Sequence, residues 1–239
     1  NLRIICNRGE YNVRKNLLPM GVLGLSLTPK AHVVSTLVCE TGRKALVITN
    51  DEANATRICA DLVTMGLKAY LFPATDRNFH TGESRSREYE RKRLGVLGLV
   101  AENNYDAVVC SVEAAMQLTI PKKVLTEKSV TLKNGADVEL DKVVNALVSA
   151  GYVRTDMIEG EGQFALRGSI LDFFPPDSGQ PVRVEFWGDE IDSIRSFDPE
   201  SQRSIENIEE IRIYPAGDFP EEEANRVSFL DYFDREETI

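Results

Sequence analysis

A rhythm of short strands and helices in the first half of the sequence restricts the fold more than any other feature. Ala45–Thr49 is rich in β-branched residues, and after it apolar residues recur at helical spacing until Gly66. Two further apolar runs, at 68–72 and at Ala107–Ser111, have the length and composition of strands. Strands that alternate with helices pair in parallel and are covered by those helices. We therefore expect an α/β domain with a parallel sheet.

The pattern changes after Pro121. The apolar stripe at 140–148 predicts one helix, and from there the sequence has the pattern of strands and turns. We expect strands at 163–174, 182–187 and 191–197, separated by a Pro-Pro loop and a Gly-Asp turn. The second half is therefore predicted to be a small α+β module with an antiparallel sheet.

The charge of the 239-residue chain is unevenly distributed. The net charge of −10 combines 18 basic and 13 acidic side chains in residues 1–128 with 10 basic and 25 acidic ones in residues 129–239. Phosphate binding needs a surplus of Lys and Arg, so the overall acidity argues against a protein that mainly wraps nucleic acid. Because 28% of the residues are charged and no apolar run is long enough to span a bilayer, we expect a soluble globular protein without a membrane partner.

The four cysteines, Cys6, Cys39, Cys59 and Cys110, lie far apart in the sequence and show no C-x-x-C spacing. This pattern predicts neither a metal site nor a redox pair and is typical of buried thiols in a cytoplasmic protein. The first residue is Asn rather than Met, no signal region is recognisable, and the sequence ends in a charged stretch. We therefore expect a piece of a longer chain.

A degenerate phosphate loop is the candidate nucleotide site. An intact loop has the pattern G-x-x-x-x-G-K-[ST], in which glycines let backbone N–H groups surround the phosphates and the hydroxyl binds magnesium. Here Gly24 and Lys30 occupy matching positions, but Pro29 replaces the second glycine and Ala31 replaces the hydroxyl residue. Pro29 lacks an N–H and Ala31 lacks a ligand atom, so an ordinary surface loop before a helix at 31–40 is the favoured interpretation.

One strand of the second half has two chemically different faces. Side chains alternate along a strand, so the apolar residues of Val182–Trp187 point to one side and Arg183, Glu185 and Trp187 to the other. If 163–174 pairs with this strand across the Pro-Pro loop, Arg167 comes near Arg183. Arg and Trp are typical of protein–protein hot spots, so this polar face is a candidate partner-binding surface.

A simpler interpretation of this face stays open, in which Arg183 and Glu185 form a solvated pair and Trp187 closes one end of the core. Elsewhere His32 and His80 have no nucleophile or metal-ligand cluster near them in the sequence, so no catalytic or metal-binding residue is predicted. One basic cluster has glutamates between its members, which favours i,i+4 ion pairs on an exposed helix over contact with phosphate. That cluster comprises Arg85, Arg87, Arg91, Lys92 and Arg93.

Two dense sequence blocks carry a family resemblance. Residues 167–175 read Arg-Gly-Ser-Ile-Leu-Asp-Phe-Phe-Pro, and residues 183–193 read Arg-Val-Glu-Phe-Trp-Gly-Asp-Glu-Ile-Asp-Ser. With shorter matches at 151–152, 197–198 and 201–203, these blocks resemble the N-terminal module of the bacterial transcription-repair coupling factors (Mfd), which is itself similar to the nucleotide excision repair protein UvrB. The match is dense from about residue 151 to residue 220 and weaker toward the start.

The resemblance implies a degenerate helicase-like α/β domain of the P-loop NTPase type with an inserted small α+β domain. Its first part is expected at residues 1–120, the inserted domain at 121–208 and the return segment at 209–239. In UvrB the phosphate loop is intact, whereas in the module that this chain resembles it is a relic, and Pro29 and Ala31 fit the relic. No nucleotide cofactor is therefore expected. Residues 76–94 are too short to include the Tyr-rich damage-probing hairpin of UvrB.

The resemblance also implies a partner. In this family the inserted domain binds UvrA, and the residues implicated fall on Arg167, Arg183 and Trp187, with Glu185 between them. It implies a non-catalytic adaptor that recruits nucleotide excision repair to stalled RNA polymerase. RNA polymerase and double-stranded DNA would bind other domains of the full-length protein, an ATP-dependent DNA translocase in which the UvrA-binding surface is masked.

Two alternatives remain at this stage. The first is an ATP-dependent UvrB-type helicase module that still uses Lys30, which predicts nucleotide binding. The second is a DNA-binding domain that uses the basic first half, which predicts steeply salt-dependent DNA binding.

Overall fold

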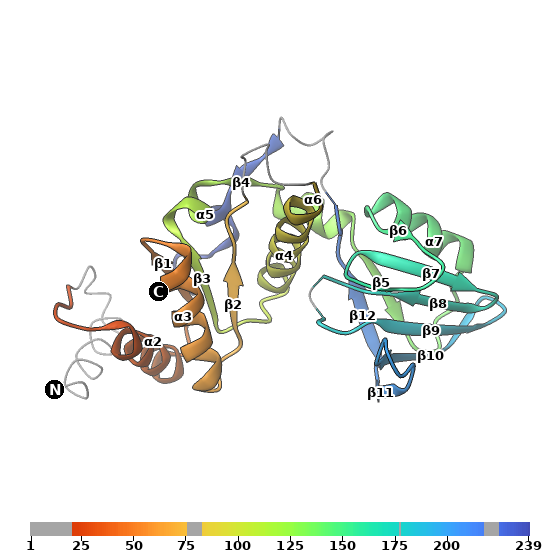
Figure 1. Cartoon of the computed structure of the whole chain (residues 1–239), viewed down its shortest axis with the longest axis horizontal. Coiled ribbons are helices and arrows are strands. Elements are labelled where there is room, and N and C mark those ends of the chain that lie inside the picture. Colours follow the sequence, from red (N-terminus) through yellow and green to blue (C-terminus); the bar gives the residue numbers. More distant parts are fainter. Residues whose placement is uncertain (1–20, 76–82, 177, 218–224) are drawn as a thin grey trace. The chain divides into compact units, whose positions relative to one another are not determined.

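The structure is a computed structural model in which the chain forms two compact units (Figure 1). The described residues are 21–75, 83–176, 178–217 and 225–239. The first unit consists of Asn1–Thr75, Leu99–Thr119 and Val227–Ile239, and the second of Asp76–Gly98 and Ile120–Arg226. The first unit is therefore assembled from three segments that are separated in the sequence by the second.

The first unit contains a three-stranded parallel sheet. Its strands are β1 (Ala45–Thr49), β2 (Ala69–Phe72) and β3 (Ala107–Ser111), in the order β1-β3-β2. Both neighbours pair with β3 in parallel, so the strand and helix rhythm of the sequence predicts this sheet correctly. All five residues of β3 are buried, as expected for the central strand of a covered sheet.

Three helices accompany this sheet: α2 (Leu27–Thr41), α3 (Glu52–Thr64) and α5 (Val112–Met116). Asp51 caps α3, because its carboxylate accepts a hydrogen bond from the backbone N–H of Asn54 at 2.7 Å. The apolar sides of α2 and α3 contribute to one core with strand residues. The buried members of that core include Ala31, Val38, Ala55, Ile58, Leu62, Ala45, Ala107 and Val109.

The end of the chain packs back onto this unit. β13 (Val227–Ser228) pairs with β4 (Leu118–Thr119), and the 3₁₀ helix η2 (Phe229–Tyr232) follows directly. The Phe229 ring is stacked on the Phe72 ring with 3.8 Å between centroids. This stacked aromatic pair buries apolar surface and fixes the returning segment on β2.

The second unit contains a six-stranded sheet, the order of which is β11-β10-β9-β8-β7-β6. Neighbouring strands are antiparallel except β6 and β7, which are parallel. Its strands are β6 (Val153–Arg154), β7 (Gln163–Arg167), β8 (Ile170–Phe173), β9 (Val182–Trp187), β10 (Glu190–Phe197) and β11 (Ser204–Asn207). Its remaining elements are α6 (Lys122–Glu127), β5 (Val130–Lys133), α7 (Leu140–Ser149) and β12 (Glu210–Ile213). Helix α4 (Glu83–Ala101) belongs to this unit up to Gly98 and to the first unit from Leu99.

One strand expectation is wrong. Residues 163–174 do not form a single strand but the antiparallel hairpin β7–β8, in which Arg167 pairs with Ile170. The reason is Gly168, which has a φ of +64° in the tight turn. A residue with a side chain rarely adopts this backbone conformation, whereas glycine adopts it without strain.

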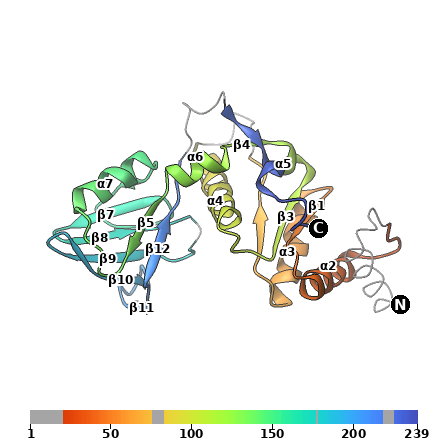
Figure 2. The same ribbon diagram turned by 180° about the vertical axis from the view of Figure 1, so that it is seen from behind.

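The two faces of the six-stranded sheet have different surroundings. One face packs against α7 and the two-stranded ribbon β5–β12, which lie over it (Figure 2). The core between them is apolar and includes Leu132, Val143, Leu147, Phe164, Leu171, Phe173, Val184, Phe186, Ile194 and Ile213. The opposite face carries polar residues of β7 to β10, among them Arg167, Asp172 and Arg183.

The unit boundaries differ from the expected domain boundaries. The second unit extends from 120 to 226 and also includes residues 76–98. The return segment was expected at 209–239, but the first unit resumes only at Val227. The reason is that β12 pairs with β5 and contributes Ile213 to the core of the second unit. In the described part of the chain, no helix is both long enough and apolar enough to span a bilayer.

Candidate partner-binding face

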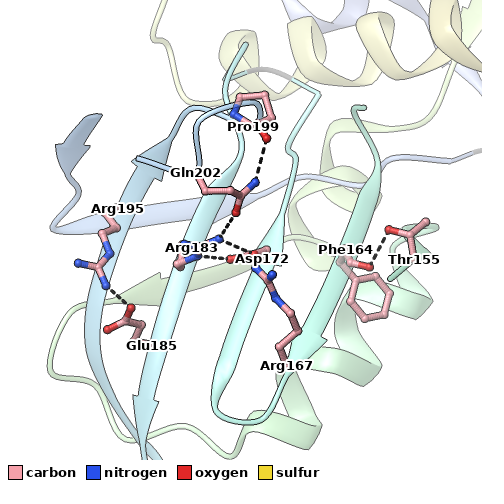
Figure 3. A network of polar contacts seen from close by, with 9 residues as sticks. All are labelled: Thr155, Phe164, Arg167, Asp172, Arg183, Glu185, Arg195, Pro199 and Gln202. Carbon is pink, nitrogen blue, oxygen red and sulfur yellow. Dashed lines mark hydrogen bonds and ion pairs between the residues drawn. The ribbon is translucent and has the colours of Figure 1, made fainter. Parts of the chain in front are cut away.

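The polar face of the six-stranded sheet brings the four candidate residues onto one surface. Arg167 lies at the end of β7, and Arg183, Glu185 and Trp187 alternate along β9. The register places Asp172 of β8 directly opposite Arg183. The alternation expected from the sequence is correct, since Val182, Val184 and Phe186 on the same strand belong to the apolar core. Figure 3 draws Arg167, Arg183 and Glu185 with their polar contacts, whereas Trp187 is not drawn.

Asp172 joins the two arginines. Arg183 donates to both carboxylate oxygens of Asp172, from Nε at 2.7 Å and from Nη2 at 2.9 Å. Arg167 donates from Nη2 to one of the same oxygens at 2.5 Å (Figure 3). A bidentate Arg–carboxylate pair is among the strongest and most directional polar contacts in proteins. Arg167 therefore lies near Arg183, as expected. The β7–β8 hairpin and the carboxylate of Asp172, which both arginines contact, bring them together.

Arg183 is held on its other sides as well. Its Nη2 donates to the side-chain oxygen of Gln202 at 2.7 Å, and Gln202 in turn donates to the carbonyl of Pro199 at 2.9 Å. The guanidinium carbon lies 4.4 Å from the centre of the Phe197 ring, which is a cation–π distance. The side chain of Arg183 is only 15% exposed, and hydrogen bonding to Asp172 raises its pKa.

The simpler interpretation of this face is wrong in both of its parts. Glu185 does not pair with Arg183 but forms an ion pair with Arg195 of β10. Trp187 does not close the core, because 82% of its surface is exposed. Tryptophan is highly buried on average, and Trp187 at the end of β9 departs from that average.

Sequence reasoning missed the residues that organise this face, chiefly Asp172, Arg195 and Gln202. Asp172 stands between Leu171 and Phe173, both of which belong to the core, so alternation places it on the polar face with Arg183. That signal was present in the sequence. The partners themselves depend on the register of β8, β9 and β10 and on the turn at Gln202, which has a φ of +59°.

The candidate phosphate loop differs from its expected geometry. Helix α2 begins at Leu27, four residues before the expected start at Ala31, so Pro29 and Lys30 lie in its first turn. Proline is accepted there because the N–H groups of the first turn have no partner within the helix. Gly24 precedes the helix with a φ of +79°, and Ala31 is completely buried in the core.

The remaining candidates behave mainly as structural residues. Lys92 pairs with Glu88 one helical turn away at 2.7 Å, which is the i,i+4 pairing expected for α4. Arg91 donates from Nε to the carbonyl of Ala216 at 3.3 Å. His32 is exposed on α2, and His80 and the side chains of Arg85 and Arg87 lie outside the described residues. Arg93 is buried.

The cysteine expectation needs one correction. Cys59 and Cys110 are buried, but Cys39 is exposed near the end of α2, and Cys6 lies outside the described residues. Among the residues that the structure describes, no group of three or more His, Cys, Asp or Glu side chains is arranged to hold a metal ion.

Comparison with known proteins adds information about this face. Residues 130–219 match the family described as the UvrB interaction domain. This range includes β5, the whole six-stranded sheet and β12, and thus the complete polar face. The chain is also 32% identical over 213 residues to the transcription-repair-coupling factor of Bacillus subtilis (strain 168). The aligned residues make up 87% of this chain and 18% of the relative. The resemblance to transcription-repair coupling factors is confirmed.

A second relative has the same name and a similar identity. The transcription-repair-coupling factor of Staphylococcus haemolyticus (strain JCSC1435) is 32% identical over 200 residues, which are 83% of this chain and 17% of that protein. The chain therefore spans less than a fifth of the length of either relative. The residues that match the UvrB interaction domain, 130–219, make up most of the second unit, which consists of Asp76–Gly98 and Ile120–Arg226.

Proposed function

We propose that this chain is a non-catalytic adaptor part of a transcription-repair coupling factor, which binds UvrA and so recruits nucleotide excision repair to stalled RNA polymerase. The observation that carries the proposal is the coincidence of the UvrB interaction domain with one face that presents Arg167, Arg183, Glu185 and Trp187 together. In a full-length relative of this kind, RNA polymerase and DNA would bind other domains, which would also supply the ATP-driven translocation.

The chemistry of the face supports a protein partner. Arg167 is 51% exposed and uses one of its nitrogens for Asp172, so most of its planar donor group is available to carboxylates of a partner. Trp187 offers a large exposed apolar anchor on the same face, two strands away from Arg167. The surrounding half of the chain is acidic, with 25 acidic and 10 basic side chains in residues 129–239, so it repels phosphate backbones.

Alanine variants of the two exposed residues test the proposal. We expect Trp187→Ala and Arg167→Ala each to weaken UvrA binding by about 1 to 4 kcal/mol, because hot-spot aromatic and arginine side chains contribute on this scale. Isothermal calorimetry with purified UvrA measures the affinity. Thermal unfolding should change little for Trp187→Ala, since its ring is exposed.

Matched controls come from the other side of the second unit. Val148 and Lys142 are exposed on α7, which covers the opposite face of the sheet, so Val148→Ala and Lys142→Ala should bind UvrA like the unchanged chain. Unaltered binding of both Trp187→Ala and Arg167→Ala would exclude this face as the site. A direct readout is available because Trp187 is the only tryptophan, so a fluorotryptophan label gives one ¹⁹F resonance that should shift on UvrA binding.

A further inference from the structure

Asp172 occupies an unusual position for a carboxylate. It lies in the middle of β8 between two core residues, and its side chain is only 4% exposed. Burial of an isolated carboxylate is strongly unfavourable unless hydrogen bonds and opposite charges compensate for the lost water. Three hydrogen bonds from Arg167 and Arg183 supply that compensation.

The carboxylate of Asp172 also offsets the repulsion between neighbouring arginine charges. The register places Arg183 opposite Arg195 on one side and opposite Asp172 on the other. Like charges directly opposite each other on a sheet are destabilising, and Glu185 already pairs with Arg195. Asp172 is therefore the anion that lets two guanidinium groups, those of Arg167 and Arg183, converge on one spot of the surface.

The exposed fractions separate the roles of the three residues. A partner has access to Arg167, at 51%, and to little of Arg183, at 15%, but hardly any access to Asp172. The oxygens of Asp172 are moreover engaged by the two guanidinium groups. Any influence of Asp172 on a bound partner therefore passes through the arginines.

We propose that Asp172 is a positioning residue for UvrA recognition, which fixes the guanidinium planes of Arg167 and Arg183 in the orientation that the partner binds. The inference rests on the proposed function. It adds to that function a buried group that makes no contact with the partner but sets the geometry of the groups that do. Preorganisation of this kind lowers the entropy lost when a complex forms.

An isosteric variant tests the inference. Asp172→Asn keeps the size of the side chain and removes its charge, so we expect UvrA affinity to fall about tenfold to a hundredfold. Glu139→Gln is the matched control, because it removes one carboxylate charge from an exposed pair with Lys142 on α7. Its affinity should stay within about twofold, as is usual for an exposed pair away from the interface.

Two readouts distinguish positioning from a merely structural role. In a double-mutant cycle, the loss caused by Asp172→Asn should shrink when Arg167 is already replaced by alanine, whereas a structural defect would act equally in both backgrounds. The ¹⁵N-detected Nε–H signal of Arg183 should exchange slowly in the unchanged chain and rapidly in Asp172→Asn, because Nε donates to Asp172.

If Asp172→Asn does not fold, Arg167→Lys decides the question. Lysine keeps the positive charge at this exposed position but lacks the planar donor group, so a fixed guanidinium orientation predicts a clear loss of affinity. Full affinity of Arg167→Lys, or of Asp172→Asn, overturns the inference while the proposed function stands. Absence of UvrA binding by the unchanged chain overturns the proposed function itself.

Discussion

The side chains of the candidate face differ in how much of each is available to a partner. Arg183 makes a bidentate contact with Asp172, donates to Gln202 and lies over Phe197. It thereby connects β9 with β8, with β10 and with the turn at Gln202. Replacement of Arg183 would leave a buried carboxylate with one remaining partner, and effects on binding would be mixed with effects on folding. The exposed residues Arg167 and Trp187 are for this reason the cleaner probes of recognition.

At the same scale, the cysteines are expected to differ in reactivity. Burial raises the pKa of the Cys59 thiol to about 11, while Cys39 is exposed on α2. Because the thiolate is the reactive form, iodoacetamide at pH 8 should modify Cys39 well before Cys59 and before the fully buried Cys110. Peptide mass spectrometry reads each position separately.

The control for this experiment is the unfolded chain. In denaturant the three thiols should react at similar rates, since burial no longer separates them. Equal rates for Cys39 and Cys59 in the folded chain would contradict the burial of Cys59 in the core of the first unit.

At the scale of single elements, the two long helices of the first unit begin differently. The Asp51 side chain accepts a hydrogen bond from the backbone of Asn54 at the start of α3, whereas Ser26 makes no such side-chain bond at the start of α2 within the described residues. Asp51→Ala should therefore lower the free energy of unfolding by about 1 kcal/mol. Chemical denaturation followed by circular dichroism measures this difference.

Ser26→Ala serves as the comparison for Asp51→Ala. It should change the free energy of unfolding by no more than about 0.5 kcal/mol, because no capping bond is lost. A larger loss for Ser26→Ala than for Asp51→Ala would show that the caps are assigned to the wrong helix.

Elements defined by local periodicity were predictable from the sequence. The bounds expected for β1 and β3 are those observed, and the helix at 140–148 corresponds to α7. Each of these segments has one hydrophobic period and a clear end signal. The hairpin β7–β8 was missed although its signal is present, because Gly168-Ser169 is a two-residue turn sequence between two apolar stretches.

The candidate site was predictable to the same extent. Alternation alone places Arg183, Glu185 and Trp187 on one face, because a strand has a period of two residues. The partners of these side chains depend on strand register, which is set by turn geometry and by the core far away in the sequence. Asp172 and Arg195 are such partners because the register sets β8 and β10 on either side of β9.

At the scale of the whole molecule, the chain combines two units with different surfaces. The first unit has a covered parallel sheet and the start of α2, where Gly24, Pro29 and Lys30 are found. The second unit contains the UvrB interaction domain match and the polar face. The proposed adaptor role needs only the second of these surfaces, so the first unit is expected to support the chain without using a nucleotide.

This expectation can be tested by titration of the whole chain with Mg-ATP. Pro29 removes a backbone donor that a phosphate loop needs, and Ala31 has no oxygen for magnesium and is buried in the core. We therefore expect no saturable heat in calorimetry, and the same flat trace for Lys30→Ala. Micromolar affinity that Lys30→Ala abolishes would instead assign a working nucleotide site to the first turn of α2, and the non-catalytic part of the proposed function would have to be abandoned.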